Sequence, residues 1–149
     1  MVIVDTSCLV TLERSGDFDI LEKVFGEINI TPEIENEFGK TLPAWVNVTK
    51  VKNLEYQDFL FTLLDKGEAS AIALMQEMKD AILIIDELKG RKVAKKLNLN
   101  YTGTLGVLLE AKKQGHIQSL KAAIAKLRLN DFRVSEAVEQ EILKRAEEG

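Results

Sequence analysis

Residues 81–88, AILIIDEL, contain the stretch that decides the fold. Four apolar residues, Ile82 to Ile85, form a continuous run that stops abruptly at Asp86 and Glu87. A short run of β-branched residues and leucine predicts a buried strand, and strands that are apolar on both faces are typical of parallel sheets. The stretch therefore predicts a core strand whose carboxyl end carries two acids.

The first residues of the chain repeat this arrangement. Met1 to Val4 form a second short apolar run, and Asp5, Thr6 and Ser7 follow it directly. In open parallel sheets, ligands bind outside the carboxyl ends of the strands. We therefore expect Asp5 and Asp86 to lie at one functional site.

Further strands are predicted at residues 28–30 and 101–102, and an edge strand within residues 46–51, where apolar and polar residues alternate. Helical spacing of apolar residues predicts helices over residues 7–14, 20–25, 31–38, 54–64, 68–79, 90–97, 105–113, 117–127 and 135–149. Residues 65–67 are interpreted as the end of the fourth helix. Strands separated by helices predict an α/β fold with three layers, α/β/α, and a mainly parallel sheet of roughly five strands.

Size and composition favour one domain over residues 1–149, because 149 residues of which 46% are hydrophobic suffice for one core. The net charge of -4 excludes a large, uniformly basic nucleic-acid platform. Cys8 is the single cysteine and no signal peptide is recognisable, so a cytoplasmic location is expected. The longest apolar runs fall far short of the roughly 20 residues of a membrane helix, so no membrane association is expected.

Acids from separate segments form the candidate catalytic group. Its members are Asp5, Glu37, Glu68 and Asp86, with Glu87 as a neighbour or substitute. Converging carboxylates do not all stay ionised at neutral pH unless a cation compensates their charge. Their hard oxygen atoms favour Mg²⁺ or Mn²⁺, whereas Zn²⁺ prefers histidine and cysteine. Such a metal site suits phosphodiester hydrolysis, because a metal ion acidifies water and neutralises charge on the phosphate.

Taken together, several motifs resemble the PIN-domain nucleases. The segments, in order, are VIVDTSCL, TPEIENEF, GEASAIAL, LIIDELKGRKVA and YTGTLGVLLEAKKQG. The likeness covers nearly the whole chain and is closest to the branch of the VapC toxins, in the subgroup with GEAxAIAL and GTLGVLL segments. This resemblance implies an α/β/α fold, an acidic metal pocket, Mg²⁺- or Mn²⁺-dependent cleavage of single-stranded RNA, and restraint by an antitoxin protein.

The resemblance also assigns roles to the acids. Asp5 matches the first aspartate of the family and Glu37 its helix glutamate, whereas Glu68 stands where many relatives have aspartate. Either Asp86 or Glu87 matches the later acid, because successive residues of an extended chain point to opposite faces. The predicted catalytic residues are thus Asp5, Glu37, Glu68 and Asp86, and the predicted metal ligands are Asp5, Glu68, Asp86 and Glu87.

Several hydroxyl and basic side chains are candidates for substrate binding. Thr6, Ser7 and Thr104 resemble the small hydroxyl residues that orient water or phosphate in this family. A basic stripe follows the acids, formed by Lys89, Arg91, Lys92, Lys95 and Lys96. The stripe is either a solvated helix face or a guide for a phosphate backbone. Arg91 either binds the substrate or pairs with a pocket carboxylate.

The acidic residues predict a metal-dependent hydrolase of phosphodiesters, and the resemblance implies an endoribonuclease of single-stranded RNA that is the toxin of a toxin–antitoxin pair. Apolar positions on the helices beyond Leu54 predict a homodimer. One alternative is a catalytically silent PIN fold that binds RNA or protein. A phosphatase with an aspartate nucleophile is disfavoured, because Ser7 occupies the place of the second acid of a DxD motif.

Overall fold

A computed structural model describes the whole chain, residues 1–149, and confirms the α/β fold. The strands are β1 (Val2–Val4), β2 (Ile28–Ile30), β3 (Val46–Val48), β4 (Ile82–Ile84) and β5 (Tyr101–Thr102). They form one sheet in the order β3-β2-β1-β4-β5, in which all neighbours are parallel. The chain runs from β1 outward to β3 and then crosses back to β4 and β5. The direction changes between β1 and β4, and parallel sheets bind ligands at such switch points.

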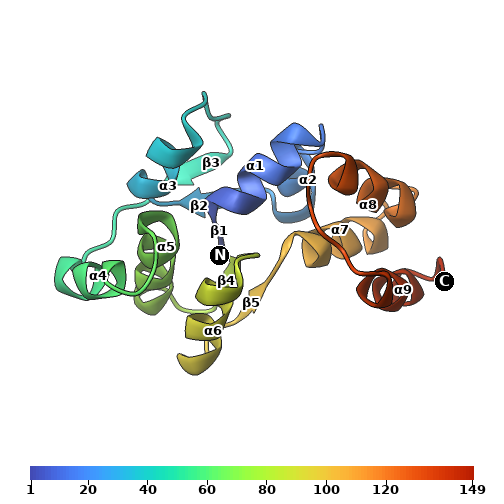
Figure 1. Ribbon diagram of the computed structural model, residues 1–149. Coiled ribbons are helices and arrows are strands. Elements are labelled where there is room, and N and C mark those ends of the chain that lie inside the picture. Colours follow the sequence, from blue (N-terminus) through green and yellow to red (C-terminus); the bar gives the residue numbers. More distant parts are fainter.

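Helices cover both faces of this sheet. They are α1 (Thr6–Arg14), α2 (Ile20–Phe25), α3 (Pro32–Phe38), α4 (Leu54–Phe61), α5 (Lys66–Glu77), α6 (Leu88–Lys96), α7 (Thr104–Lys113), α8 (Leu120–Leu129) and α9 (Glu136–Arg145). Helices α4, α5 and α6 lie on one side of the sheet and α1, α2 and α7 on the other (Figure 1). The predicted three-layer architecture is therefore confirmed. No helix combines the length and hydrophobicity needed to cross a lipid bilayer.

The strands have only two or three residues each, and burial of their side chains in the core stabilises the sheet. Ile3, Val4, Leu83 and Ile84 are completely buried in the two central strands. Each such side chain contributes roughly 1.5–3 kcal/mol when it leaves water. Helix α5 is buried continuously over residues 67–75, as expected from its apolar circumference. The switch point is thus built on the most deeply packed part of the molecule.

One predicted helix boundary is wrong in a way that matters for the site. Residues 65–67 do not end the preceding helix, which stops at Phe61, but begin the next one. The Asp65 carboxylate accepts a hydrogen bond from the backbone N–H of Glu68 at 2.9 Å, so Asp65 caps α5. An acid followed three residues later by glutamate is typical of helix starts, and this signal outweighs the turn character of Gly67.

The C-terminal helices α8 and α9 pack against α7 outside the sheet layers. Helix α8 starts at Leu120, three residues later than predicted. Glu148 accepts hydrogen bonds from the backbone N–H groups of Leu120 and Lys121 and pairs with Lys112 at 3.1 Å. These contacts lower the pKa of Glu148, chiefly through the hydrogen bond from Leu120. The end of the chain is therefore fastened to the start of α8.

Candidate active site

A pocket of about 330 Å³ opens at the carboxyl edge of the sheet. Its lining residues are Asp5, Thr6, Ser7, Val10, Thr11, Glu37, Asp65 and Glu87. Five of these were predicted as site residues from the sequence: Asp5, Thr6, Ser7, Glu37 and Glu87. We call this pocket the acid pocket. Glu68, Asp86, Arg91 and Thr104 are not among its lining residues.

Asp5 occupies the position that caps α1 but does not act as a cap. Its carboxylate makes no capping hydrogen bond, although the side chain is only 2% exposed. The Oδ1 atom is buried without any hydrogen-bond partner. The pKa of Asp5 is raised to about 7, chiefly by burial and also by the negative charges of Asp65, Glu37 and Asp86, although a hydrogen bond from the Thr6 backbone lowers it. Burying a carboxylate oxygen without a hydrogen-bond partner costs folding free energy. A role as a helix cap therefore does not explain why Asp5 is buried here.

Glu68 lies in the first turn of α5, close to Asp65. The carboxylate is buried, and its Oε2 atom has no hydrogen-bond partner. Burial raises the pKa of Glu68 to about 8, and a hydrogen bond and the negative charge of Asp65 act in the same direction. Sequence reasoning missed Asp65 as a site residue, although the spacing of Asp65 and Glu68 was a recognisable signal. The structure thus adds Asp65 to the predicted acids.

Glu37 reaches the pocket from the last turn of α3. Its Oε1 atom accepts a hydrogen bond from the Thr6 hydroxyl at 2.5 Å. A Cβ atom at Gly67 would collide with the Glu37 carboxylate and approach the Thr6 hydroxyl. The side chain of Glu37 is exposed, so this contact, rather than burial, holds it beside Asp5. Thr6 therefore positions an acid and does not offer a free hydroxyl.

Asp86 is held by the start of α7. Its Oδ1 atom accepts from the backbone N–H of Thr104 at 2.9 Å, and its Oδ2 atom accepts from the Thr104 hydroxyl at 2.6 Å. A Cβ atom at Gly103 would collide with Asp86 Oδ1. Thr104 was predicted to bind substrate, but its hydroxyl is directed to Asp86. The two hydrogen bonds fix the orientation of this carboxylate.

Three glycines lie beside the acids and leave room for their carboxylates. Gly67 adjoins Glu37, Gly103 adjoins Asp86, and Gly90 adjoins Glu68, whose Oε2 atom a Cβ at Gly90 would meet. None of these glycines has a positive φ, so the backbone conformation does not require them. The room they leave is occupied by acid side chains from other segments. This arrangement supports a built site rather than a chance accumulation of charge.

Comparison with known proteins bears on this arrangement. A PIN-domain family model matches residues 1–148. The chain belongs to the PIN-domain family. No curated protein and no solved structure shows significant similarity to it. The predicted resemblance is therefore confirmed for the family, and PIN domains are generally nucleases.

The acids of this PIN domain have no cationic partners in the protein. None of Asp5, Glu37, Asp65, Glu68, Asp86 and Glu87 takes part in an ion pair. Arg91 does not pair with a pocket carboxylate, so that alternative is wrong. Its guanidinium instead lies over the ring of Tyr101, 5.4 Å from the centroid. No side chain thus neutralises these acids by forming an ion pair with them.

The fit of these residues to a divalent cation follows from their donor atoms. Asp5 Oδ1 and Glu68 Oε2 are buried oxygens without partners, as a hard cation requires. The predicted set of Asp5, Glu68, Asp86 and Glu87 is not gathered into a metal centre, because no three acid, histidine or cysteine side chains form one. The negative charges of the acids repel one another, and both Asp86 carboxylate oxygens accept hydrogen bonds from Thr104. Mg²⁺ usually binds one or two carboxylates and several waters, so the residues present fit it.

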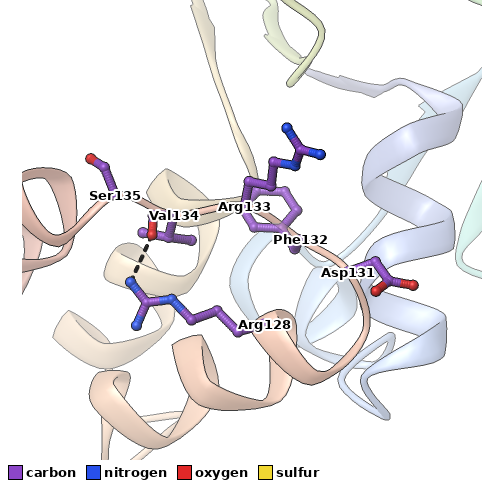
Figure 2. Close-up of a pocket in the computed structure, with 6 residues that line it drawn as sticks. All are labelled: Arg128, Asp131, Phe132, Arg133, Val134 and Ser135. Carbon is purple, nitrogen blue, oxygen red and sulfur yellow. Dashed lines mark hydrogen bonds between the residues drawn. The ribbon is translucent and has the colours of Figure 1, made fainter.

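A larger hollow, of about 700 Å³, lies away from the acids on the α8–α9 connection. It is lined by Arg128, Asp131, Phe132, Arg133, Val134 and Ser135 (Figure 2). Arg128 donates to the Val134 carbonyl at 2.7 Å and pairs with Glu139. These contacts join α8 to α9, and the hollow contains a single carboxylate. Its chemistry is therefore that of a surface connection, and the acid pocket remains the candidate site.

Proposed function

We infer that this protein is a single PIN domain over residues 1–149 that acts as a Mg²⁺- or Mn²⁺-dependent endoribonuclease on single-stranded RNA. The observation that carries this proposal is the group of six acids at the sheet switch point, none of which has a cationic partner. Together with membership of a nuclease family, this arrangement favours hydrolysis of phosphodiesters over simple binding.

The residues divide into ligands and positioning groups. Asp5 and Glu68 are the candidate ligands with unpaired buried oxygens, and Asp86 is a further candidate whose orientation Thr104 fixes. Glu37 and Glu87 face the pocket and can order water at its mouth. The bound cation would supply a Lewis acid for the phosphate and acidify the attacking water. The attacking oxygen adds to phosphorus, and the bond from phosphorus to the leaving oxygen breaks.

Ser7 and the basic stripe support a nucleic-acid substrate. Ser7 lines the acid pocket, and its hydroxyl is buried without a hydrogen-bond partner, so a small rearrangement would let it bind water or a phosphate oxygen. Lys89, Lys92, Lys95 and Lys96 are exposed on α6, directly after the acids, and form no ion pairs. Free cations beside a metal-binding pocket suit a phosphate backbone.

The finer assignment to the VapC-like branch, with an antitoxin protein as partner, is supported by the sequence segments quoted above. An apolar surface around α4 supports a protein partner or a homodimer. Leu54, Phe59 and Leu63 are 59%, 59% and 46% exposed there. We expect static light scattering to give the mass of two chains at micromolar concentration. A mass of one chain at every concentration would contradict the homodimer.

The proposed function is tested by cleavage of a labelled single-stranded RNA with Mn²⁺, with EDTA as the metal-free control. We expect wild-type cleavage, and a loss of at least about a hundredfold in Asp86→Asn, because even partners of metal ligands contribute 10–100-fold. The matched control is Asp58→Asn, which makes the same change at an exposed, unpaired acid on α4. Equal cleavage by all three proteins, or cleavage in EDTA, would refute the proposal. Single-stranded DNA as substrate tests the preference for RNA.

A further inference from the structure

A second cleft, of about 410 Å³, lies between α6, α7 and α9 and shares no lining residue with the acid pocket. Arg91 of α6, Leu105 of α7, and Val138, Glu141 and Ile142 of α9 line it, together with Arg145. Figure 1 shows α9 beside α7, on the outer side of the molecule. We call it the α7–α9 cleft. Its volume lies within the roughly 300–1,000 Å³ of small-ligand sites.

Arg91 connects this cleft with the acids. An ideal Cβ atom at Gly103 would lie 3.1 Å from Arg91 Nη2 and 2.6 Å from Asp86 Oδ1, so the guanidinium and this carboxylate flank the same glycine. The Arg91 Nε atom is buried and has no hydrogen-bond partner. No carboxylate pairs with Arg91, and the ring of Tyr101 holds its guanidinium in place. An arginine that is held in place and forms no ion pair is suited to bind a phosphate group in bidentate geometry.

The remainder of the cleft combines one more cation, Arg145, and the carboxylate of Glu141 with apolar side chains. Arg145 contacts only Glu141, at 3.4 Å and on an exposed surface, so this pair contributes little and is easily exchanged. Val138 is 48% exposed, and Leu105 and Ile142 are partly buried. Two arginines and an apolar floor match a nucleotide, which has an anionic phosphate and a flat base with apolar faces.

We propose that the α7–α9 cleft binds one nucleotide of single-stranded RNA next to the scissile phosphate, with its phosphate at Arg91 and Arg145 and its base on Leu105, Val138 and Ile142. This inference rests on the proposed function, because it extends the substrate path from the acid pocket. The C-terminal helix α9 thereby becomes a wall of the substrate site. Gly103 adjoins both Arg91 and Asp86, so the cleft leads towards an acid of the candidate site. The two arginines complement the negative charge of a phosphate. Both features favour RNA over an apolar peptide as the occupant.

The test compares binding of a fluorescein-labelled, single-stranded RNA of about ten nucleotides by fluorescence anisotropy in Ca²⁺, and cleavage of the same RNA in Mn²⁺. The variants are Val138→Asp and Arg145→Ala, both at exposed positions. An acid in the first turn suits the start of α9, so Val138→Asp is compatible with folding. The matched controls are Leu129→Asp, at an exposed apolar residue of α8, and Arg14→Ala, at an exposed arginine of α1.

We expect each cleft variant to raise Kd and KM by about tenfold while kcat stays near the wild-type value, because a binding contact outside the reacting atoms is lost. The controls should stay within about twofold of wild type. Cleft variants that match the controls would overturn the inference, and a partner protein would then be the better occupant. Continued Mn²⁺-dependent cleavage in that case leaves the proposed function intact. If wild type neither binds nor cleaves the RNA, both fail.

Discussion

Asp5→Asn is expected to abolish metal-dependent cleavage and, at the same time, to stabilise the metal-free protein at pH 8. The substitution keeps the shape of the side chain and removes its charge. Burial raises the pKa of Asp5 from 3.8 to about 7, so at pH 8 the ionised carboxylate is held in an unfavourable environment. A shift of this size corresponds to roughly 4 kcal/mol at most, at about 1.4 kcal/mol per pH unit. Acids that serve function at the expense of stability behave in this way.

The measurement is chemical denaturation of wild type and Asp5→Asn at pH 8 in EDTA. The expected increase in the free energy of unfolding is a few kcal/mol, within the limit of roughly 4 kcal/mol. Asp58→Asn is the matched control, because this exposed acid forms no ion pair. A lower stability of Asp5→Asn would show that the carboxylate makes favourable contacts, and the argument from its unpaired oxygen would be wrong.

The stability of the metal-free protein is expected to fall as the pH rises from 5 to 9. Asp5 and Glu68 have pKa values of about 7 and about 8 in the folded protein, above their ordinary values of 3.8 and 4.5. At pH values between the ordinary and the raised pKa of each acid, the folded state binds more protons than the unfolded state. The free energy of unfolding therefore declines as the pH rises. Glu148 acts in the opposite sense, because its pKa is lowered, but only as the pH falls below about 4.5.

A divalent cation should remove this decline. Metal binding requires deprotonated carboxylates, so Mn²⁺ competes with protons and stabilises the folded state more at pH 8 than at pH 5. Thermal unfolding over this pH range, with EDTA and with Mn²⁺, provides the measurement. The double variant Asp5→Asn/Glu68→Gln should show neither the decline nor the response to Mn²⁺. An equal Mn²⁺ effect on wild type at pH 5 and pH 8 would contradict the role of these acids.

Most of the fold could be predicted from the sequence, because β1 and β4 are short, uninterrupted apolar runs and the other strands are separated by segments with helical periodicity. β2 and β5 have the predicted bounds, β1 lies within the apolar run Met1 to Val4, and β4 covers the first three residues of the run before Asp86. Helix ends were less predictable, since capping depends on single side chains. Residues 65–67 illustrate this limit, because Asp-Lys-Gly has the composition of a turn but starts α5. The error concealed Asp65, which lines the acid pocket.

Five of the eight residues that line the acid pocket were candidates from the sequence, but their contacts could not be predicted. A strand followed by an acid places Asp5 and Asp86 at one sheet edge, and this inference needs no side-chain geometry. The pairing of Asp86 with Thr104, by contrast, joins residues 18 positions apart and has no periodic signal. The same holds for the space that Gly90 leaves for Glu68. The exposure of Glu37 likewise gave no reason to expect it beside Asp5, apart from the family motif.

The central claim is that acids from distant parts of the chain meet at the switch point and together bind a divalent cation. It is tested most directly by the anomalous signal of a crystal soaked in Mn²⁺. We expect one strong Mn²⁺ peak in contact with the Asp5 carboxylate and with at least one of Glu68 and Asp86. Strong peaks elsewhere on the molecule, with no peak at Asp5 at saturating Mn²⁺, would contradict it.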